Sequence, residues 1–96
     1  MSAYIVITRL RIRDRAEFDL YAEEAASFSI GHNVKRLANL GHHEVLEGAA
    51  VDGVVILEFP SFAEAKAWYE SPAYQAASRH RHQGGDFNIV IVEGVA

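Results

Sequence analysis

The chain has 96 residues, of which 50% are hydrophobic and 23% are charged, and its formal net charge is −4. This length suits one globular domain over residues 1–96. The acidic balance argues against a nucleic-acid surface, no apolar stretch is long enough to span a bilayer, and the absence of cysteine excludes disulfides and thiolate ligands.

Residues 4–12 alternate in the way that is typical of a strand, with Tyr4 beginning one face and Ile5 the other. The face of Ile5 continues into a basic cluster, Arg9, Arg11 and Arg13. We interpret this cluster as a solvated strand edge rather than an anion site. Because no basic stretch precedes the apolar run, we expect no signal peptide and a cytoplasmic location.

A first helix is expected after Asp14, which can cap it, with Glu17 as the reciprocal partner of a capping box. Apolar residues recur at helical spacing to about Ser29, and His32 would then cap the C-terminus. The helix is therefore expected to be long and amphipathic.

Three further extended segments follow. A long, irregular second strand is expected over residues 34–39 and 43–47, with a break between them. Residues 54–59 form a β-branched, nearly continuous apolar run, which predicts a third strand, and residues 87–93 predict a fourth.

Two helices are expected between the third and fourth strands. Ser61 and Glu64 form a second capping-box pattern, and Ser71 before Pro72 would open a further short helix. The resulting order is βαββαβ, which indicates an α+β ferredoxin-like fold with a four-stranded antiparallel sheet and its helices on one face. The later strands are apolar on both faces, so we expect a second copy of the chain to cover the free face in a homodimer.

Several segments resemble a known family. They are residues 14–21, 43–48, 56–61 and 90–94, and residues 67–75, which read Ala-Trp-Tyr-Glu-Ser-Pro-Ala-Tyr-Gln. The chain resembles the family called domain of unknown function 1330, in the dimeric α/β-barrel superfamily. That superfamily also contains cofactor-free monooxygenases and ethyl-tert-butyl-ether-degradation-type proteins. The resemblance implies a ferredoxin-like fold, a dimeric α/β barrel and no cofactor.

The second strand departs from the family pattern, which is similar to Gly-Gly-Arg-Phe-Leu-Val-Arg-Gly-Gly. Lys35 matches the first family arginine in charge, but Asn39 replaces the second. If the second arginine anchors a carboxylate in relatives, this chain has lost a bidentate donor there. Arg81 matches the arginine expected before the fourth strand.

Arg81 is the first candidate for a site residue, because an arginine near a sheet–helix cleft can hold an anionic or enolic substrate. The aromatic residues expected to line that cleft are Tyr4, Phe18, Trp68 and Tyr74. Trp68, Tyr69 and Tyr74 lie at helical spacing, so their alternative is a purely structural place in the core. The alternative for Arg81 is an ion pair with Glu44, Glu47 or Asp86.

The histidines are a second source of candidates. His43 follows the bend in the second strand and could serve as a base in the cleft, although a hydrated turn is its simpler interpretation. His80 and His82 would need a third ligand, such as Asp86 or His43, to bind a metal. We interpret them as a solvated pair at a helix end and predict no metal site.

These residues lead to three hypotheses. The first is a homodimer with one small-molecule cavity per subunit, as in a cofactor-independent enzyme acting on an aromatic or enolisable metabolite. In that case Arg81 and Asn39 would position the substrate and His43 would transfer the proton. The others are a non-catalytic ligand-binding or accessory module and a purely structural dimer.

Overall fold

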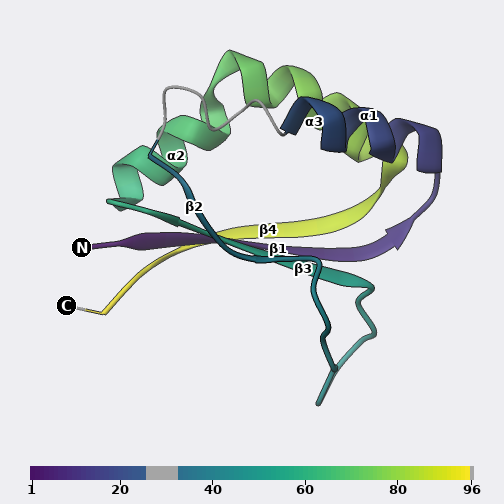
Figure 1. Ribbon diagram of the computed structural model, residues 1–96, viewed down its shortest axis with the longest axis horizontal. Coiled ribbons are helices and arrows are strands. Elements are labelled where there is room, and N and C mark those ends of the chain that lie inside the picture. The colour runs from purple at the N-terminus through teal and green to yellow at the C-terminus, as the bar shows by residue number, and fades with distance from the viewer. Residues whose placement is uncertain (26–32, 96) are drawn as a thin grey trace.

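The computed structural model describes residues 1–25 and 33–95. These residues form a four-stranded antiparallel sheet with three helices on one of its faces (Figure 1). In chain order the elements are β1 (Ala3–Ile12), α1 (Arg15–Ala25), β2 (Lys35–Asn39), β3 (Gly53–Phe59), α2 (Phe62–Glu70), α3 (Pro72–Gly84) and β4 (Gly85–Glu93). The strand order is β2-β3-β1-β4. The predicted ferredoxin-like fold is thereby confirmed.

The predicted helix starts are confirmed by their caps. The Asp14 carboxylate accepts hydrogen bonds from the first turn of α1, at 3.1 Å from the nitrogen of Ala16. Ser61 and Ser71 cap α2 and α3 in the same way. Glu17 does not complete the expected capping box, because its carboxylate lies 2.6 Å from the ring of His80. The predicted end of the first helix near Ser29, and His32, lie outside the described residues.

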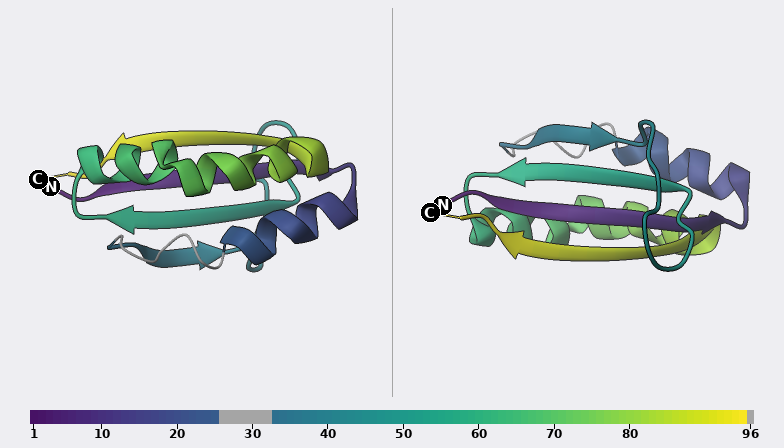
Figure 2. Two further views of the ribbon diagram at one scale, coloured as in Figure 1. Left: turned by 90° about the horizontal axis from the view of Figure 1, so that it is seen from above. Right: turned by 90° about the horizontal axis from the view of Figure 1, so that it is seen from below.

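The third helix differs from the expectation of a short segment, since α3 has 13 residues and includes His80. It lies alongside α1, while α2 continues it toward the other end of the sheet (Figure 2). Close approach of α1 depends on Gly84, where an added Cβ would lie 2.7 Å from the backbone nitrogen of Phe18. The carbonyl of Gly84 also accepts hydrogen bonds from the backbone nitrogens of Arg13 and Asp14, which fix the turn into α1.

The alternation predicted for the first strand ends at an irregularity between Arg9 and Arg11. Before it, Ile5, Ile7 and Arg9 face the helices, as the sequence pattern indicates. After it, Arg11 is paired with Asp86 and Ile12 turns toward the core. The basic cluster is therefore divided between the two faces of the sheet.

The second strand is shorter than predicted. β2 ends at Asn39, and residues 43–47 are an exposed part of the loop between β2 and β3 rather than a strand. The loop leaves the sheet on the side away from the helices and crosses below β1 (Figures 1 and 2). Its base is tied to the sheet by backbone hydrogen bonds from Leu40 to Val54 and from Asp52 to Arg9.

The core lies between the sheet and the helices. Its buried residues are Ala3, Ile5, Ile7, Phe18, Tyr21, Leu57, Phe59, Ala65, Trp68, Tyr74 and Ala77. The other sheet face, which we call the open face, carries Tyr4, Val6, Val54, Ile56, Val90 and Val92. Val90 is 57% exposed and Val92 is 50% exposed, so one subunit leaves apolar surface uncovered here. Within the described ranges, no helix is long and apolar enough to cross a membrane.

Candidate functional site

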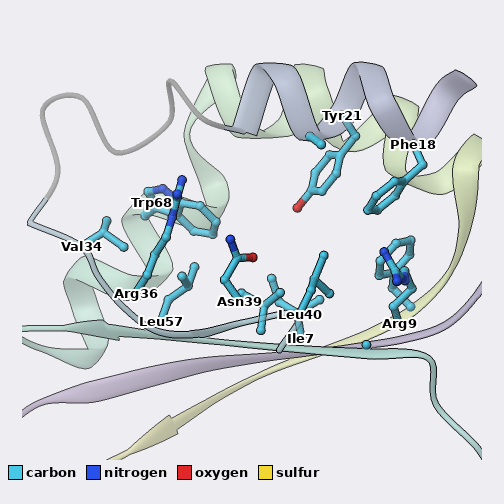
Figure 3. A pocket seen from close by; sticks show the side chains of 14 residues that line it. Ile7, Arg9, Phe18, Tyr21, Val34, Arg36, Asn39, Leu40, Leu57 and Trp68 are labelled. Atoms are coloured by element: carbon cyan, nitrogen blue, oxygen red, sulfur yellow. The ribbon is translucent and has the colours of Figure 1, made fainter. Parts of the chain in front are cut away.

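A pocket of about 240 Å³ opens between the helix-facing side of the sheet and the helices (Figure 3). It is lined by Ile7, Arg9, Phe18, Tyr21, Ala22, Val34, Arg36, Asn39, Leu40, Gly53, Val55, Leu57, Trp68 and Phe87. Most of these side chains are apolar or aromatic, and two of them are arginines. Ligand sites commonly measure about 300–1,000 Å³. This pocket therefore suits a molecule about the size of a single ring.

The β2 wall of the pocket depends on a register shift between Arg36 and Ala38. The shift places Arg36 and Asn39, three residues apart, on the same face of the sheet, where both line the pocket. Lys35 is paired with Glu58 and therefore lies on the opposite face. Lys35, which we matched in charge to the first family arginine, therefore does not line the pocket, whereas its neighbour Arg36 does.

Arg9 and Arg36 carry the positive charge at the pocket wall. The Nε of Arg9 lies 2.5 Å from a carboxylate oxygen of Asp52, and its guanidinium lies 5.0 Å from the centre of the Phe18 ring. Asp52 therefore offsets the charge of Arg9. Arg36 makes no ion pair with any described carboxylate within 4.0 Å, so its charge is available to a ligand.

A pair of phenols lies at the helix side of the pocket. The hydroxyl oxygens of Tyr21 and Tyr74 are 3.0 Å apart, and the two rings meet edge to face with centroids 6.2 Å apart. Tyr21 lines the pocket, whereas Tyr74 is completely buried behind it. Burial raises the pKa of both phenols. Trp68 lies against Tyr74 with ring centroids 4.4 Å apart and forms part of the pocket wall.

Arg81 lies behind the same wall and is only 4% exposed. Its guanidinium is 5.5 Å from the centre of the Phe87 ring, and its Nε has no hydrogen-bond partner. No described carboxylate lies within salt-bridge distance of it, and every Asp and Glu of the chain is in the described part. Asp86, one of the expected partners, instead binds Arg11 and Arg13. The ion-pair alternative for Arg81 is therefore not what the structure shows.

The structure brings some of the predicted site residues together and separates others. Asn39 and Trp68 line the pocket, and Tyr74 and Arg81 lie directly behind its wall. Tyr4 lies on the open face, because it pairs with Glu58 and alternates with the pocket-facing residues of β1. The expectation that Tyr4 lines the cleft is therefore wrong.

The candidate histidines His43, His80 and His82 do not line the pocket. His43 is exposed in the loop between β2 and β3, where its Nε2 is 3.0 Å from the carbonyl oxygen of Val51. It cannot reach a ligand in the pocket of its own subunit, since the loop extends to the other side of the sheet. His80 and His82 belong to α3, and the described residues contain no cluster of three or more potential metal ligands.

Three pocket residues were not recognised from the sequence as site residues. Arg9 looked like part of a solvated strand edge, and the register shift after Arg36, which places Asn39 on the same face as Arg36, leaves no clear sequence signal. Tyr21 has the spacing of a core residue on an amphipathic helix. In the structure it also lines the pocket, and its hydroxyl is paired with that of Tyr74. A tyrosine among apolar helix positions was the available signal.

The fold and site define a small ferredoxin-like α+β protein with a mixed aromatic and basic pocket between sheet and helices. The family model described as "Domain of unknown function (DUF1330)" matches residues 2–95, and the chain belongs to this family. No curated protein sequence matches the chain.

Solved structures show the same fold at low sequence identity. The protein of unknown function RPA0582 from Rhodopseudomonas palustris has a TM-score of 0.77 and 17% identity, over 99% of this chain and 83% of that one. A dimeric ferredoxin-like protein of unknown function from Thermobifida fusca has a TM-score of 0.65 and 14% identity, over 96% and 90%. SnoaB, a cofactor-independent oxygenase from Streptomyces nogalater, has a TM-score of 0.60 and 11% identity, over 99% and 93%.

Proposed function

We propose that the protein is a homodimer that binds a small, planar, anionic molecule in the pocket of each subunit. The observation that carries this proposal is the combination of an aromatic wall with the unpaired guanidinium of Arg36. A planar guanidinium binds carboxylates in a bidentate manner, and Trp68 and Phe18 offer flat apolar surface to the body of the ligand. Asn39 adds a neutral donor and acceptor beside Arg36.

The homodimer is proposed to form through the open face. Its exposed valines, Val90 and Val92, lie on neighbouring positions of the same face as Val6 and Ile56, so a second copy can bury them together. Several structures with this fold are described as dimeric. The loop between β2 and β3 extends past this face and would lie beside the second copy.

A second candidate function is a cofactor-independent reaction on an aromatic or enolisable ligand. It is favoured by the Tyr21 hydroxyl at the pocket wall and by the fold shared with SnoaB. The base that we expected, His43, lies outside the pocket, so binding is the better supported proposal.

The proposal is tested with a pair of matched variants. Arg36→Gln should weaken binding of benzoate at least tenfold, since a charge-assisted hydrogen bond contributes about 1.5–3 kcal/mol. Lys35→Gln removes the same charge from the neighbouring residue on the opposite face and should leave binding unchanged. Trp68, the single tryptophan, reports binding by its fluorescence. Equal losses in the two variants would refute a specific role for the pocket.

A further inference from the structure

The two pocket arginines lie at opposite ends of the cavity (Figure 3). Arg9 of β1 is paired with Gly53 of β3, and Arg36 of β2 is paired with Leu57 of the same strand. These two positions of β3 are four residues apart, which corresponds to about 13 Å along an extended strand. Val55 lies between them on the same face and also lines the pocket. The pocket is therefore elongated, with an arginine at each end.

The contacts around Arg9 hold its side chain in one place. Its Nε donates to a carboxylate oxygen of Asp52 at 2.5 Å, and its Nη2 donates to the backbone carbonyl of the same residue at 3.2 Å. The guanidinium lies 5.0 Å from the centre of the Phe18 ring. Gly53 leaves room beside it, since an added Cβ would lie 3.3 Å from both Cζ and Nε of Arg9. These contacts leave the Arg9 side chain only 14% exposed.

The two ends of the pocket differ in charge and in free donors. A guanidinium has five N–H groups, and Asp52, the sole acceptor for Arg9 among the described residues, takes two of them. Three N–H groups of Arg9 are left for an acceptor in the pocket. The Asp52 carboxylate also offsets the charge of Arg9, whereas Arg36 has no ion pair with any described carboxylate. Arg36 therefore suits a carboxylate, and Arg9 suits an uncharged oxygen that accepts hydrogen bonds.

We propose that the ligand is a planar aromatic carboxylate with a second, uncharged oxygen acceptor at the opposite end of its ring, and that Arg9 selects for this oxygen. The inference rests on the proposed binding of an anion at Arg36 and adds the second functional group of the ligand. A ligand without that oxygen would displace water from the Arg9 donors and leave them without an acceptor. Sites built to hydrogen-bond a ligand group reject analogues that lack it for this reason.

The experiment compares 4-formylbenzoate with 4-vinylbenzoate by isothermal titration calorimetry. The two probes share the ring, the carboxylate and a closely similar planar outline, but only the formyl group ends in an oxygen. We expect the wild-type protein to bind 4-formylbenzoate at least tenfold more tightly than 4-vinylbenzoate. Arg9→Met should abolish this preference. Arg11→Met replaces another β1 arginine that is paired with an aspartate but does not line the pocket, and it should keep the preference.

A second variant should gain binding, which a misfolded protein could not imitate. Asp52→Asn removes the charge that offsets Arg9, so its pocket would carry an uncompensated guanidinium at both ends. Terephthalate, which has a carboxylate at each end of its ring, should therefore bind at least tenfold more tightly to Asp52→Asn than to the wild-type protein. The absence of any gain would refute the assignment of an uncharged group to the Arg9 end.

The outcomes for the two benzoates separate this inference from the binding function. If both probes bind the wild-type protein with equal affinity, or if the preference for the formyl group persists in Arg9→Met, the role of Arg9 is refuted and anion binding at Arg36 stands. If neither probe binds, both proposals are overturned. Loss of both probes by the same factor in Arg9→Met would show that Arg9 supplies only charge or shape, and would also refute its selective role.

Discussion

Replacing Arg81 by Met is expected to stabilise the fold while it weakens the binding of anionic ligands. Arg81 is 4% exposed and has no ion pair among the described carboxylates, so the folded state bears a desolvation cost of roughly several kcal/mol. Against this stands the contact of its guanidinium with the Phe87 ring, 5.5 Å from the ring centre, which is worth up to about 2 kcal/mol.

Methionine is unbranched and adaptable, so Arg81→Met should fill most of the vacated volume without leaving a large cavity. The balance of the opposing effects is a gain of about 1 kcal/mol in the free energy of unfolding. For a domain of this length that gain corresponds to a rise in Tm of roughly 4–8 °C. The natural arginine would then be retained for the ligand at the expense of stability.

Thermal and urea unfolding of both proteins, without ligand, measure the change. The matched control is Arg79→Met, which makes the same replacement at an exposed position of α3 and should change stability by less than about 0.5 kcal/mol. A loss of more than about 2 kcal/mol in Arg81→Met would refute the reasoning, because it would show that Arg81 stabilises the folded core.

Three other changes test separate parts of the structure. Gly84→Ala should lower the free energy of unfolding by about 1–3 kcal/mol in urea titrations, since the new methyl group would overlap the backbone of α1, whereas Gly41→Ala has open space and should not. The pKa of Asp86 is lowered in the folded protein, mainly by the hydrogen bond from Arg11. The ionised carboxylate therefore stabilises the fold at any pH above its usual pKa, and this stabilisation is lost as the pH falls through the lower pKa of the folded state. Asp86→Asn should therefore flatten the acid end of the stability profile, and an unchanged acid slope would contradict this. Val90→Lys should convert the proposed dimer into monomers by light scattering, and a persistent dimer would place the interface elsewhere.

Much of the fold follows from local sequence signals. The caps at Asp14, Ser61 and Ser71 involve residues close in sequence, so the pattern and the structure agree there. The second strand was predicted too long because apolar residues such as Val45 and Leu46 suggest an extended segment. In the structure Leu46 is 84% exposed, and nothing local to the sequence shows that these residues leave the sheet.

The site was harder to predict because it depends on contacts across the sheet. Trp68 and Asn39 were expected at a cleft, and both line the pocket. The expectation failed for Tyr4 because it lies on the sheet face that the helices leave uncovered. Which face the helices cover depends on tertiary packing and cannot be read from the alternation of the strand. In an unbroken strand Asn39 would share a face with Lys35, but the one-residue shift after Arg36 places Asn39 on the face of Arg36 instead.

The central claim is that the pocket binds planar anions, and the most direct test is a fluorescence titration of Trp68 with benzoate and with benzamide. The two ligands share a ring and differ in charge. We expect a saturable change with benzoate and an affinity for benzamide at least tenfold lower, because only the carboxylate can pair with Arg36. Equal affinities, or no saturable change with either ligand, would contradict the account.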